Sequence, residues 1–361
     1  MTRPTRPCPP PPLAAVQAPG IDRRQLLRAA PLAAGLGLLQ GLPVQAQAAT
    51  LLRIASVVPK NSVYHQQLQQ LGEAWRAAQG EGARYSVFTD GSQGGEAEIV
   101  RRMRIGQLQG ALVSVVGLRE IEPTVAALQN LPLAFRSWEE LDFVRERMRP
   151  AMDARFAERG FVILGWGDAG WVRFFSRKAA QRPADYRSMK FFAWGAEPEQ
   201  QAIMKNLGYT PVPLETADIL PSIQTGMIDV VPSTPYFALA SQIHETAGHM
   251  LEINWAPIVG ALVVTRKAWD AMSPAAQAAL RSGGERASLA MRTRARAEVD
   301  EAVEAMRKRG LQIHRPDAAQ LREWQALADE LYPRIRGTLV PASTFDEVFA
   351  LLKTYRSGKG R

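Results

Sequence analysis

Cysteine is almost absent from this chain of 361 residues, which contains only Cys8. One thiol cannot form an intramolecular disulfide, and Cys8 lies in an N-terminal segment that we expect to be removed. It also precedes the apolar run of that segment, whereas the cysteine of a lipid anchor would follow it. We therefore expect a mature chain without a disulfide, a thiol nucleophile or a lipid anchor, and its stability must come from packing.

The chain also lacks an apolar run of membrane-spanning length. Residues 29–42 form the run nearest to the N-terminus, and they are too few for the roughly 20 residues that a spanning helix needs. This run follows Arg23-Arg24 and precedes the small residues Ala46-Gln47-Ala48. The order predicts an export signal over residues 1–48, cleaved near Ala48, and no stable membrane insertion. The paired arginines favour the twin-arginine route over the general secretory route, whose signals are also basic at the start.

Catalytic motifs are equally scarce, because the chain contains no G-x-S-x-G elbow, P-loop or haem motif. His244 and His249 are five residues apart. Five residues on a helix turn through about 500°, which leaves the two imidazoles about 140° apart and unable to share a zinc ion. We interpret them as exposed residues near a helix end, and no third zinc ligand is evident. We expect no enzyme activity, no metal and no cofactor.

A glycine-rich segment, Gly91-Ser92-Gln93-Gly94-Gly95, precedes a helical pattern. Such a loop can hold an anion with its backbone N–H groups. A plain turn followed by the start of a helix is the favoured interpretation.

Charge of one sign is not concentrated anywhere in the mature chain. The whole sequence has a formal net charge of +9, and without residues 1–48 it has 39 basic and 34 acidic residues. The two signs alternate along RTRARAEVDEAVEAMRKR at residues 292–309. This pattern is typical of a solvated helix and gives no basic stripe, so we expect no nucleic-acid partner.

Short apolar runs separated by helical patterns are what the chain does contain. Runs of four to six residues at 161–166, 172–176, 189–193 and 228–231 predict buried strands. Helical patterns at 197–207 and 217–225 end at Gly208 and Gly226, where a left-handed C-cap residue is favourable. Because strands and helices alternate, we expect an α/β protein with mostly parallel sheets.

The rest of the chain continues this alternation. Strands are predicted at 51–58, 85–88 and 111–116, with helices from Tyr64 to Gly80 and at 96–107 between them. Ser137 and Glu140 form a capping box for another helix. A very long helix starts at Ser273-Pro274 and reaches Arg309, interrupted only at Gly283-Gly284.

Five segments together resemble the solute-binding proteins of tripartite ATP-independent periplasmic (TRAP) transporters. They are LPLAFRSWEEL at residues 131–141, followed in order by GWGDAGWVRFFS, RPADYRSMKFF, LGYTPVPL and SIQTGMID. The resemblance covers nearly all of the chain from residue 51 onward. It implies a two-lobed periplasmic binding protein fold, with a cleft between the lobes and a long helix that spans both.

The resemblance also implies a domain division and a function. We expect lobe I at residues 49–169, completed by about 258–298, and lobe II at residues 170–257, completed by about 299–361. The expected function is periplasmic capture of a small organic acid or related polar solute and its delivery to TRAP membrane permease subunits. The alternative is a periplasmic sensing module that presents its solute to a receptor. The solute and the oligomeric state do not follow from the sequence.

Two arginines that commonly hold the substrate carboxylate in this family are missing here. The corresponding positions carry Phe192 and Val172. Arg173 is adjacent, but a slip of one residue in a strand turns a side chain to the opposite face unless a bulge intervenes. We therefore expect aromatic surface in place of bidentate arginine contacts, and weak binding of C4 dicarboxylates.

The remaining candidates lie at strand ends or on loops that the resemblance places around the cleft. For Phe192, as for Trp166, packing in the core is an equal alternative. Glu197 could orient a ligand hydroxyl or amine, or could simply stabilise a helix N-terminus. The full candidate set for ligand binding is Asn61, Tyr64, Ser114, Trp171, Arg173, Phe192, Trp194, Glu197, Thr234, Tyr236 and Trp255.

Overall fold

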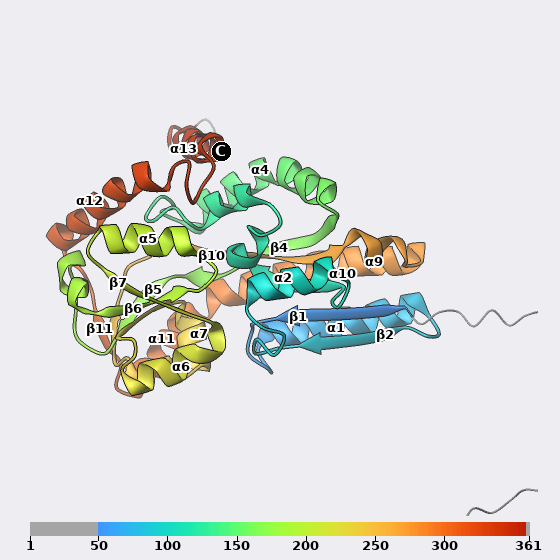
Figure 1. The fold of residues 1–361 in the computed structure, drawn as a ribbon, viewed down its shortest axis with the longest axis horizontal. Coiled ribbons are helices and arrows are strands. Elements are labelled where there is room, and N and C mark those ends of the chain that lie inside the picture. The colour runs from blue at the N-terminus through green and yellow to red at the C-terminus, as the bar shows by residue number, and fades with distance from the viewer. Residues whose placement is uncertain (1–49, 359–361) are drawn as a thin grey trace, which may run out of the picture. The chain divides into compact units, whose positions relative to one another are not determined.

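The computed structural model describes residues 50–358, whose helices and strands are shown in Figure 1. The predicted export signal and its cleavage site near Ala48 lie outside the described residues. Among the described residues, no helix combines the length and apolar content needed to cross a bilayer.

The first sheet has five strands in the order β2-β1-β3-β10-β4. Its centre is apolar on both faces, because Leu52, Ile54, Ala261 and Val263 are all fully buried. The expected strands near the N-terminus are therefore present, with ends displaced by one or two residues. The bounds are β1 Leu51–Ser56, β2 Arg84–Phe88, β3 Gly110–Ser114, β4 Phe161–Trp171 and β10 Pro257–Thr265.

The second sheet has six strands in the order β11-β9-β5-β8-β6-β7. Its apolar core includes Phe175, Phe192, Val231 and Met250. The expected apolar runs at 172–176, 189–193 and 228–231 correspond to β5, β6 and β8. The bounds are β5 Arg173–Ser176, β6 Lys190–Trp194, β7 Thr210–Leu214, β8 Val230–Ser233, β9 His249–Leu251 and β11 Gln312–His314.

Both sheets are mixed, which differs from the expectation of mostly parallel sheets. β1 pairs in parallel with β2 and β3, and β6 pairs in parallel with β7 and β8. The antiparallel pairs all involve β10 or β5. β10 and β5 each follow directly after the chain has passed from one sheet to the other. Each therefore runs opposite to the neighbouring strands with which it pairs.

Three passages connect the two sheets. Val172 alone separates β4 from β5, and residues 252–256 separate β9 from β10. The first two passages lie side by side, since the Val172 N–H donates to the Ala256 carbonyl at 2.8 Å and the Trp255 N–H donates to the Val172 carbonyl at 3.1 Å. The third passage lies between helices α10 (Pro274–Ala297) and α11 (Val299–Lys308), where Glu298 ends one helix and begins the other.

The remaining helices cover the sheets, as Figure 1 shows. The expected C-cap of α6 is present, since Gly226 has φ 75° and ψ 18°. The α-helices are α1 Val63–Gln79, α2 Glu96–Arg104, α3 Val115–Leu118, α4 Trp138–Glu158, α5 Pro198–Asn206, α6 Thr216–Thr225, α7 Pro235–Ala240, α8 Ile243–Thr246, α9 Arg266–Asp270, α12 Ala318–Ile335 and α13 Ala342–Arg356, and the 3-10 helices are η1 Pro123–Leu128 and η2 Pro183–Ser188.

The long helical pattern after Ser273 breaks at Glu298 and runs without interruption through Gly283-Gly284. The predicted interruption is therefore wrong, and close packing explains the glycines. A Cβ on Gly284 would lie 2.6 Å from the Leu164 Cβ and 2.9 Å from its carbonyl oxygen. The absence of side chains at this point lets α10 approach the β4 backbone.

The C-terminal helices pack against both halves of the protein. Trp324 of α12 belongs to a core cluster with Phe174 and Phe191 of the second sheet. Val348 and Leu352 of α13 belong to a larger cluster with residues of the first sheet and of α4. Arg356 fixes the end of α13, because its Nε and Nη2 donate to Glu140 of α4, each at 2.8 Å.

Candidate functional site

A cavity of about 320 Å³ is lined by residues of both sheets. The first sheet contributes residues of β1, β3, β4 and β10, and the second contributes residues of β5, β6 and β8. Helices α5 and α12 complete the wall with apolar side chains. Seven of the candidate residues line this cavity: Tyr64, Ser114, Phe192, Trp194, Glu197, Thr234 and Trp255.

The other four candidates do not line the cavity wall. Asn61 is exposed in a turn with φ 64°, and its N–H donates to His65 Nδ1 at 3.0 Å. Trp171 is buried against Trp138, with ring centroids 4.5 Å apart. Tyr236 packs edge-on against Tyr64 at 5.9 Å, so it supports a lining residue from behind.

Arg173 is the fourth, and strand geometry explains its position. Val172 and Phe174 line the cavity, and β5 pairs with β8 in regular register from Arg173↔Ser233 onward. With no bulge in this pairing, Arg173 does not replace Val172 in the wall. Its Nη1 instead lies 3.4 Å from Glu252 Oε1. Burial lowers the pKa of Arg173, against the opposing effect of Glu252.

Aromatic side chains dominate the second-sheet side of the cavity. Phe192 and Trp194 meet edge to face at 4.8 Å, and Phe192 is also part of the second-sheet core. Trp255 lies 5.5 Å from both Phe174 and Trp324. These rings give the cavity a large apolar surface with fixed orientation.

Several polar candidates have structural hydrogen bonds in addition to facing the cavity. Ser114 is the N-cap of α3, and Thr234 is the N-cap of α7 with its Oγ1 accepting from the Phe237 N–H. Tyr64 is different, because its buried hydroxyl has no hydrogen-bond partner among the described residues. Burial is the main reason why the pKa of Tyr64 is raised.

The charged groups that line the cavity are three carboxylates, Glu96, Asp168 and Glu197, and no Lys, Arg or His is among the described lining residues. Burial raises the pKa of each. Glu197 is partly balanced by Arg119, whose Nη1 lies 3.3 Å from its Oε1. The charged side chains in this lining are thus acidic, whereas the resemblance to the family implies a pair of arginines in relatives.

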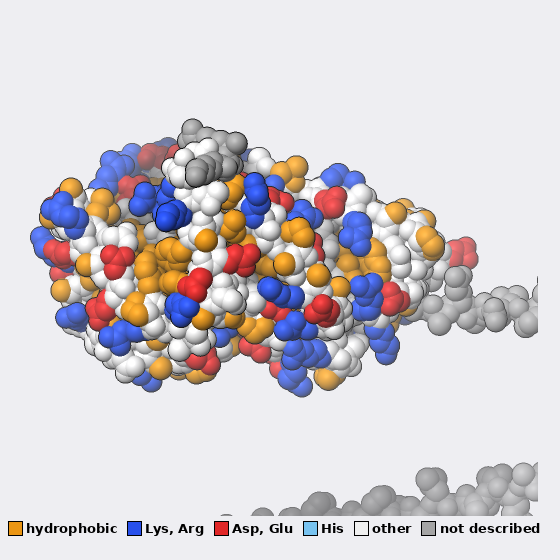
Figure 2. Space-filling view, turned by 90° about the horizontal axis from the view of Figure 1, so that it is seen from above, with side chains coloured by type: hydrophobic (Ala, Val, Ile, Leu, Met, Phe, Trp, Pro, Cys, Tyr) orange, Lys and Arg blue, Asp and Glu red, His pale blue; other side chains and the backbone are white. Residues whose placement is uncertain are grey.

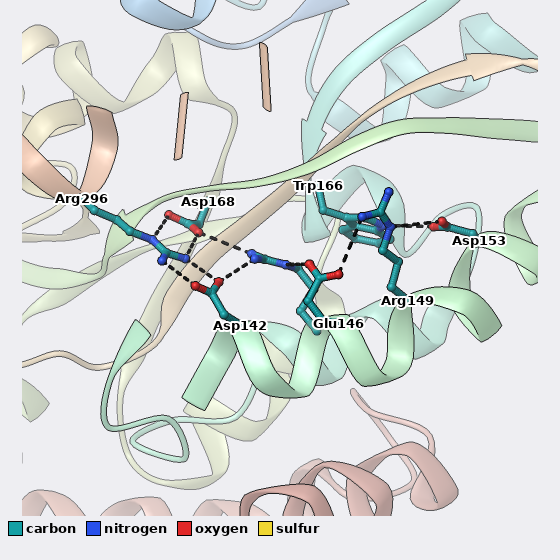
Figure 3. Close-up of polar contacts among 8 residues, drawn as sticks. Asp142, Glu146, Arg149, Asp153, Trp166, Asp168 and Arg296 are labelled. Atoms are coloured by element: carbon teal, nitrogen blue, oxygen red, sulfur yellow. Dashed lines mark hydrogen bonds and ion pairs between the residues drawn. The ribbon is translucent and has the colours of Figure 1, made fainter. Parts of the chain in front are cut away.

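Asp168 belongs to an ion-pair network with Asp142 and Arg296 (Figure 3). Arg296 of α10 donates from Nη2 to Asp168 at 2.7 Å and to Asp142 of α4 at 2.7 Å. Arg145 lies 3.5 Å from Asp168 on another side. Because two arginines face two aspartates, the charge of Asp168 is balanced within the network.

Sequence reasoning missed Glu96, Asp168 and Asn130. A signal was available for Asp168, since an acidic residue inside the apolar strand segment GWGDAGW is rarely buried without a partner. The role of Glu96 was hidden, because its contacts with Ser114 and Gly117 join residues about 20 positions apart. Asn130 is buried 3.5 Å from Glu197, a pairing of residues that only the fold brings together.

The structure also tests what we expected of the histidines and of the glycine-rich segment at residues 91–95. His244 is buried in α8 with Nδ1 3.3 Å from the Ala238 carbonyl, and His249 stands on β9 next to His314, so exposed helix-end histidines were the wrong interpretation. Residues 50–358 contain no group of three His, Cys, Asp or Glu side chains placed to hold a metal ion. The glycine loop forms a turn before α2, and a Cβ on Gly95 would lie 1.9 Å from Glu215 Oε2.

The surface shows mixed charge. On the face seen in Figure 2, basic and acidic side chains are interspersed, with apolar side chains between them.

Comparison with known proteins gives a consistent picture. The profile of the family described as bacterial extracellular solute-binding protein, family 7, matches residues 54–337. An uncharacterised protein, YiiZ of Salmonella typhimurium, is 30% identical over 200 residues, which are 54% of this chain and 60% of that protein. The C4-dicarboxylate-binding periplasmic protein DctP of Rhodobacter capsulatus is 20% identical over 253 residues, which are 68% of this chain and 76% of that protein.

Solved structures share the fold. A TRAP periplasmic solute-binding protein of Xanthobacter autotrophicus with bound β-D-galacturonate superposes with a TM-score of 0.75. The two chains are 18% identical, and the superposition covers 84% of this chain and 99% of the other.

Proposed function

Because this chain belongs to family 7 of the bacterial extracellular solute-binding proteins, we propose that it captures a small organic acid or related polar solute in the periplasm and delivers it to the membrane subunits of a TRAP transporter. The observation that carries the proposal is the cavity of about 320 Å³, to which both sheets contribute lining residues. A site shared by two halves can close on a ligand by rotation about the passages between them.

Export precedes this function. We propose that residues 1–48 are removed and that the mature protein acts in the periplasm, in agreement with the periplasmic name of the Rhodobacter relative. Mass spectrometry of the mature protein should give an N-terminus near Ala49, and a chain that retains Cys8 would contradict this.

The moving parts are proposed to be the two lobes defined by the passages. Lobe I comprises residues 49–169 and 258–298, and lobe II comprises residues 170–257 and 299–361. The packing of α13 against α4 of lobe I supports a modification, in which the last helix of the chain moves with lobe I. Lobe II then ends within or just after α12.

The cavity wall favours some solutes over others. Phe192 and Val172 line the cavity where relatives carry arginines, so a C4 dicarboxylate would leave at least one carboxylate without a bidentate partner. A monocarboxylate or a neutral polar solute with an apolar or aromatic body should bind better. Its body would lie against Trp194 and Phe192, with its oxygen atoms near Ser114 and Thr234.

Calorimetry with a panel of organic acids, together with X-ray scattering, tests the proposal. A bound solute should reduce the radius of gyration and be recovered unchanged, and Trp194→Ala should weaken its binding by roughly 1–3 kcal/mol through loss of a large aromatic contact. Phe143→Ala is the control, since Phe143 packs against Tyr355 and does not line the cavity. Tight binding of succinate with no effect of Trp194→Ala would contradict the proposed mode, and conversion of the solute would contradict a transport role.

A further inference from the structure

The described residues that line the cavity include three carboxyl groups and no Lys, Arg or His. We propose that the solute carries a protonated amino group that pairs with Glu96, whether or not it also carries an acid group. This inference rests on the proposed function, because it names the chemical class of solute for the same cavity.

Glu96 is the lining carboxylate that lacks a cation among the described residues. Its side chain is 7% exposed, and both its oxygens accept hydrogen bonds. The Ser114 N–H donates to Oε1 at 2.9 Å, and the Ser114 hydroxyl and the Gly117 N–H donate to Oε2 at 2.7 and 2.9 Å. Burial raises the pKa of this carboxyl group and the three donors oppose that effect, but no cation among the described residues does, so an ammonium group of a ligand would supply the missing stabilisation of its ionised form.

The other two lining carboxyl groups, Asp168 and Glu197, each have at least one arginine nearby, but none of these arginines lines the cavity. Asp168 is balanced by Arg296 and Arg145. Arg119 contacts Glu197 at 3.3 Å and Glu199 at 3.5 Å, so one arginine faces two carboxylates. An anionic ligand would therefore disfavour the ionised form of these carboxyl groups further, whereas an ammonium group would favour it.

A second polar group without a partner belongs to another residue of the same cavity wall. The Tyr64 hydroxyl is buried, and it has no partner within the described part of the chain. Tyr64 lines the same cavity as Glu96. A buried hydroxyl without a partner is unfavourable, and a ligand group that donates to it or accepts from it removes the cost.

The aromatic wall is compatible with the same ligand. Phe192 and Trp194 line the cavity from the second sheet, and Ser114 and Asp168 line it from the first. Aromatic faces attract cations through the ring quadrupole as well as packing with apolar groups. An amine attached to an apolar or aromatic body therefore fits both sides of the cavity.

Glu96 has a structural role too, since it accepts from the first N–H groups of α3. That role alone explains its hydrogen bonds, and it predicts no preference for amines. The two possibilities therefore differ in the ligand selectivity of the protein.

Three compounds that share a phenylethyl body distinguish an amine-binding role of Glu96 from a purely structural one. 3-Phenylpropionate carries only a carboxylate, phenethylamine carries only an amine, and phenylalanine carries both. Calorimetry on the mature protein should show both amine-bearing compounds binding about tenfold or more tightly than 3-phenylpropionate, the scale of a charge-assisted hydrogen bond. Equal or tighter binding of 3-phenylpropionate would overturn the inference and leave the proposed function intact. Failure of both amines to bind would overturn it as well.

Glu96→Gln removes the charge and should abolish the advantage of the amines while 3-phenylpropionate binds at least as well as before. Glu98→Gln is the matched control on the same helix, since Glu98 pairs with Arg101 and Arg102 and does not line the cavity. Circular dichroism checks that each variant is folded. If Glu96→Gln does not fold, the three-compound series on the unaltered protein still decides the matter. A folded Glu96→Gln protein that keeps the preference for amines would count against the inference.

Discussion

At the scale of single residues, the wall of the cavity depends on side chains that face away from it. Arg296 joins Asp168 of β4 to Asp142 of α4 (Figure 3). Its guanidinium also lies 4.5 Å from the centre of the Trp138 ring. Trp138 in turn packs on Trp171 at the end of β4. The position of Asp168 at the cavity is therefore fixed from outside by a cation and two tryptophans.

Arg296→Ala should lower the free energy of unfolding by about 3 kcal/mol or more, because it leaves Asp168 buried with Arg145 as its remaining cation. Arg294→Ala in the same helix is the control. Arg294 pairs with Glu298 but has a side chain that is 58% exposed, so its loss should cost less than about 1 kcal/mol. Urea unfolding of both variants measures the difference, and equal effects would show that the network adds nothing specific.

Residue-level prediction from the sequence depended on local rules. The alternation of a strand indicated that Arg173 could take the place of Val172 only through a bulge, but it could not say whether a bulge is present, and Arg173 stayed among the candidates. Such rules could not place Asn61, because a turn with positive φ directs that residue to solvent. They could not assign Glu96 either, since the contacts of its carboxylate depend on how α2 meets the start of α3.

At the scale of secondary structure, two adjacent glycines show how a helix can be misread from its sequence. Glycine weakens a helix by roughly 1 kcal/mol relative to alanine, so a pair of them predicts an interruption. In α10 they are retained within the helix because other residues come close to them, the Leu164 backbone to Gly284 and the Leu71 side chain to Gly283. The pattern of a single chain segment contains no information about such a neighbour.

Gly284→Ala should therefore destabilise the protein by about 1–3 kcal/mol in spite of the gain in helix propensity, because the new Cβ meets the Leu164 Cβ and carbonyl, which cannot rotate away. Gly283→Ala offers a control one residue earlier. Its Cβ would meet the Leu71 Cδ1 at 2.6 Å, and that methyl group can rotate away. Thermal unfolding should show a clearly smaller loss for Gly283→Ala than for Gly284→Ala, and the reverse order would refute the packing explanation.

At the scale of the whole molecule, family membership confirms the expected two-lobed fold and the expectation of a binding protein over an enzyme. Five ordered segments were sufficient for this, since they extend over both sheets. The bulge in β4, shortly before the passage to β5, was not foreseen. It lies where the register with β10 shifts between Ile258 and Val259, and Gly170 there has φ 111°.

At this bulge, near the junction of the lobes, Gly170 has a positive φ that glycine adopts without strain. Gly170→Ala should lower the free energy of unfolding by about 1–3 kcal/mol and weaken lobe closure, since alanine is strained at this φ and its Cβ would lie 3.3 Å from Thr234. Gly167→Ala on the same strand is the control, because its Cβ would meet only the Ser288 carbonyl at 3.9 Å. Denaturant unfolding measures the first effect and scattering with a bound solute the second. Equal stability of the two variants would remove the argument for strain at the junction.

The return of the C-terminal helices to the first sheet has a consequence for the order in which the protein folds. Leu331, Ile335, Val348 and Leu352 belong to the same hydrophobic cluster as Ala111 and Val113 of β3 and Phe161 of β4. Domains generally fold from the N-terminus as they leave the ribosome, but here the core of the first sheet includes residues of α12 and α13, which are far downstream of β3 and β4. We therefore expect this core to complete its packing only after α13 has been synthesised.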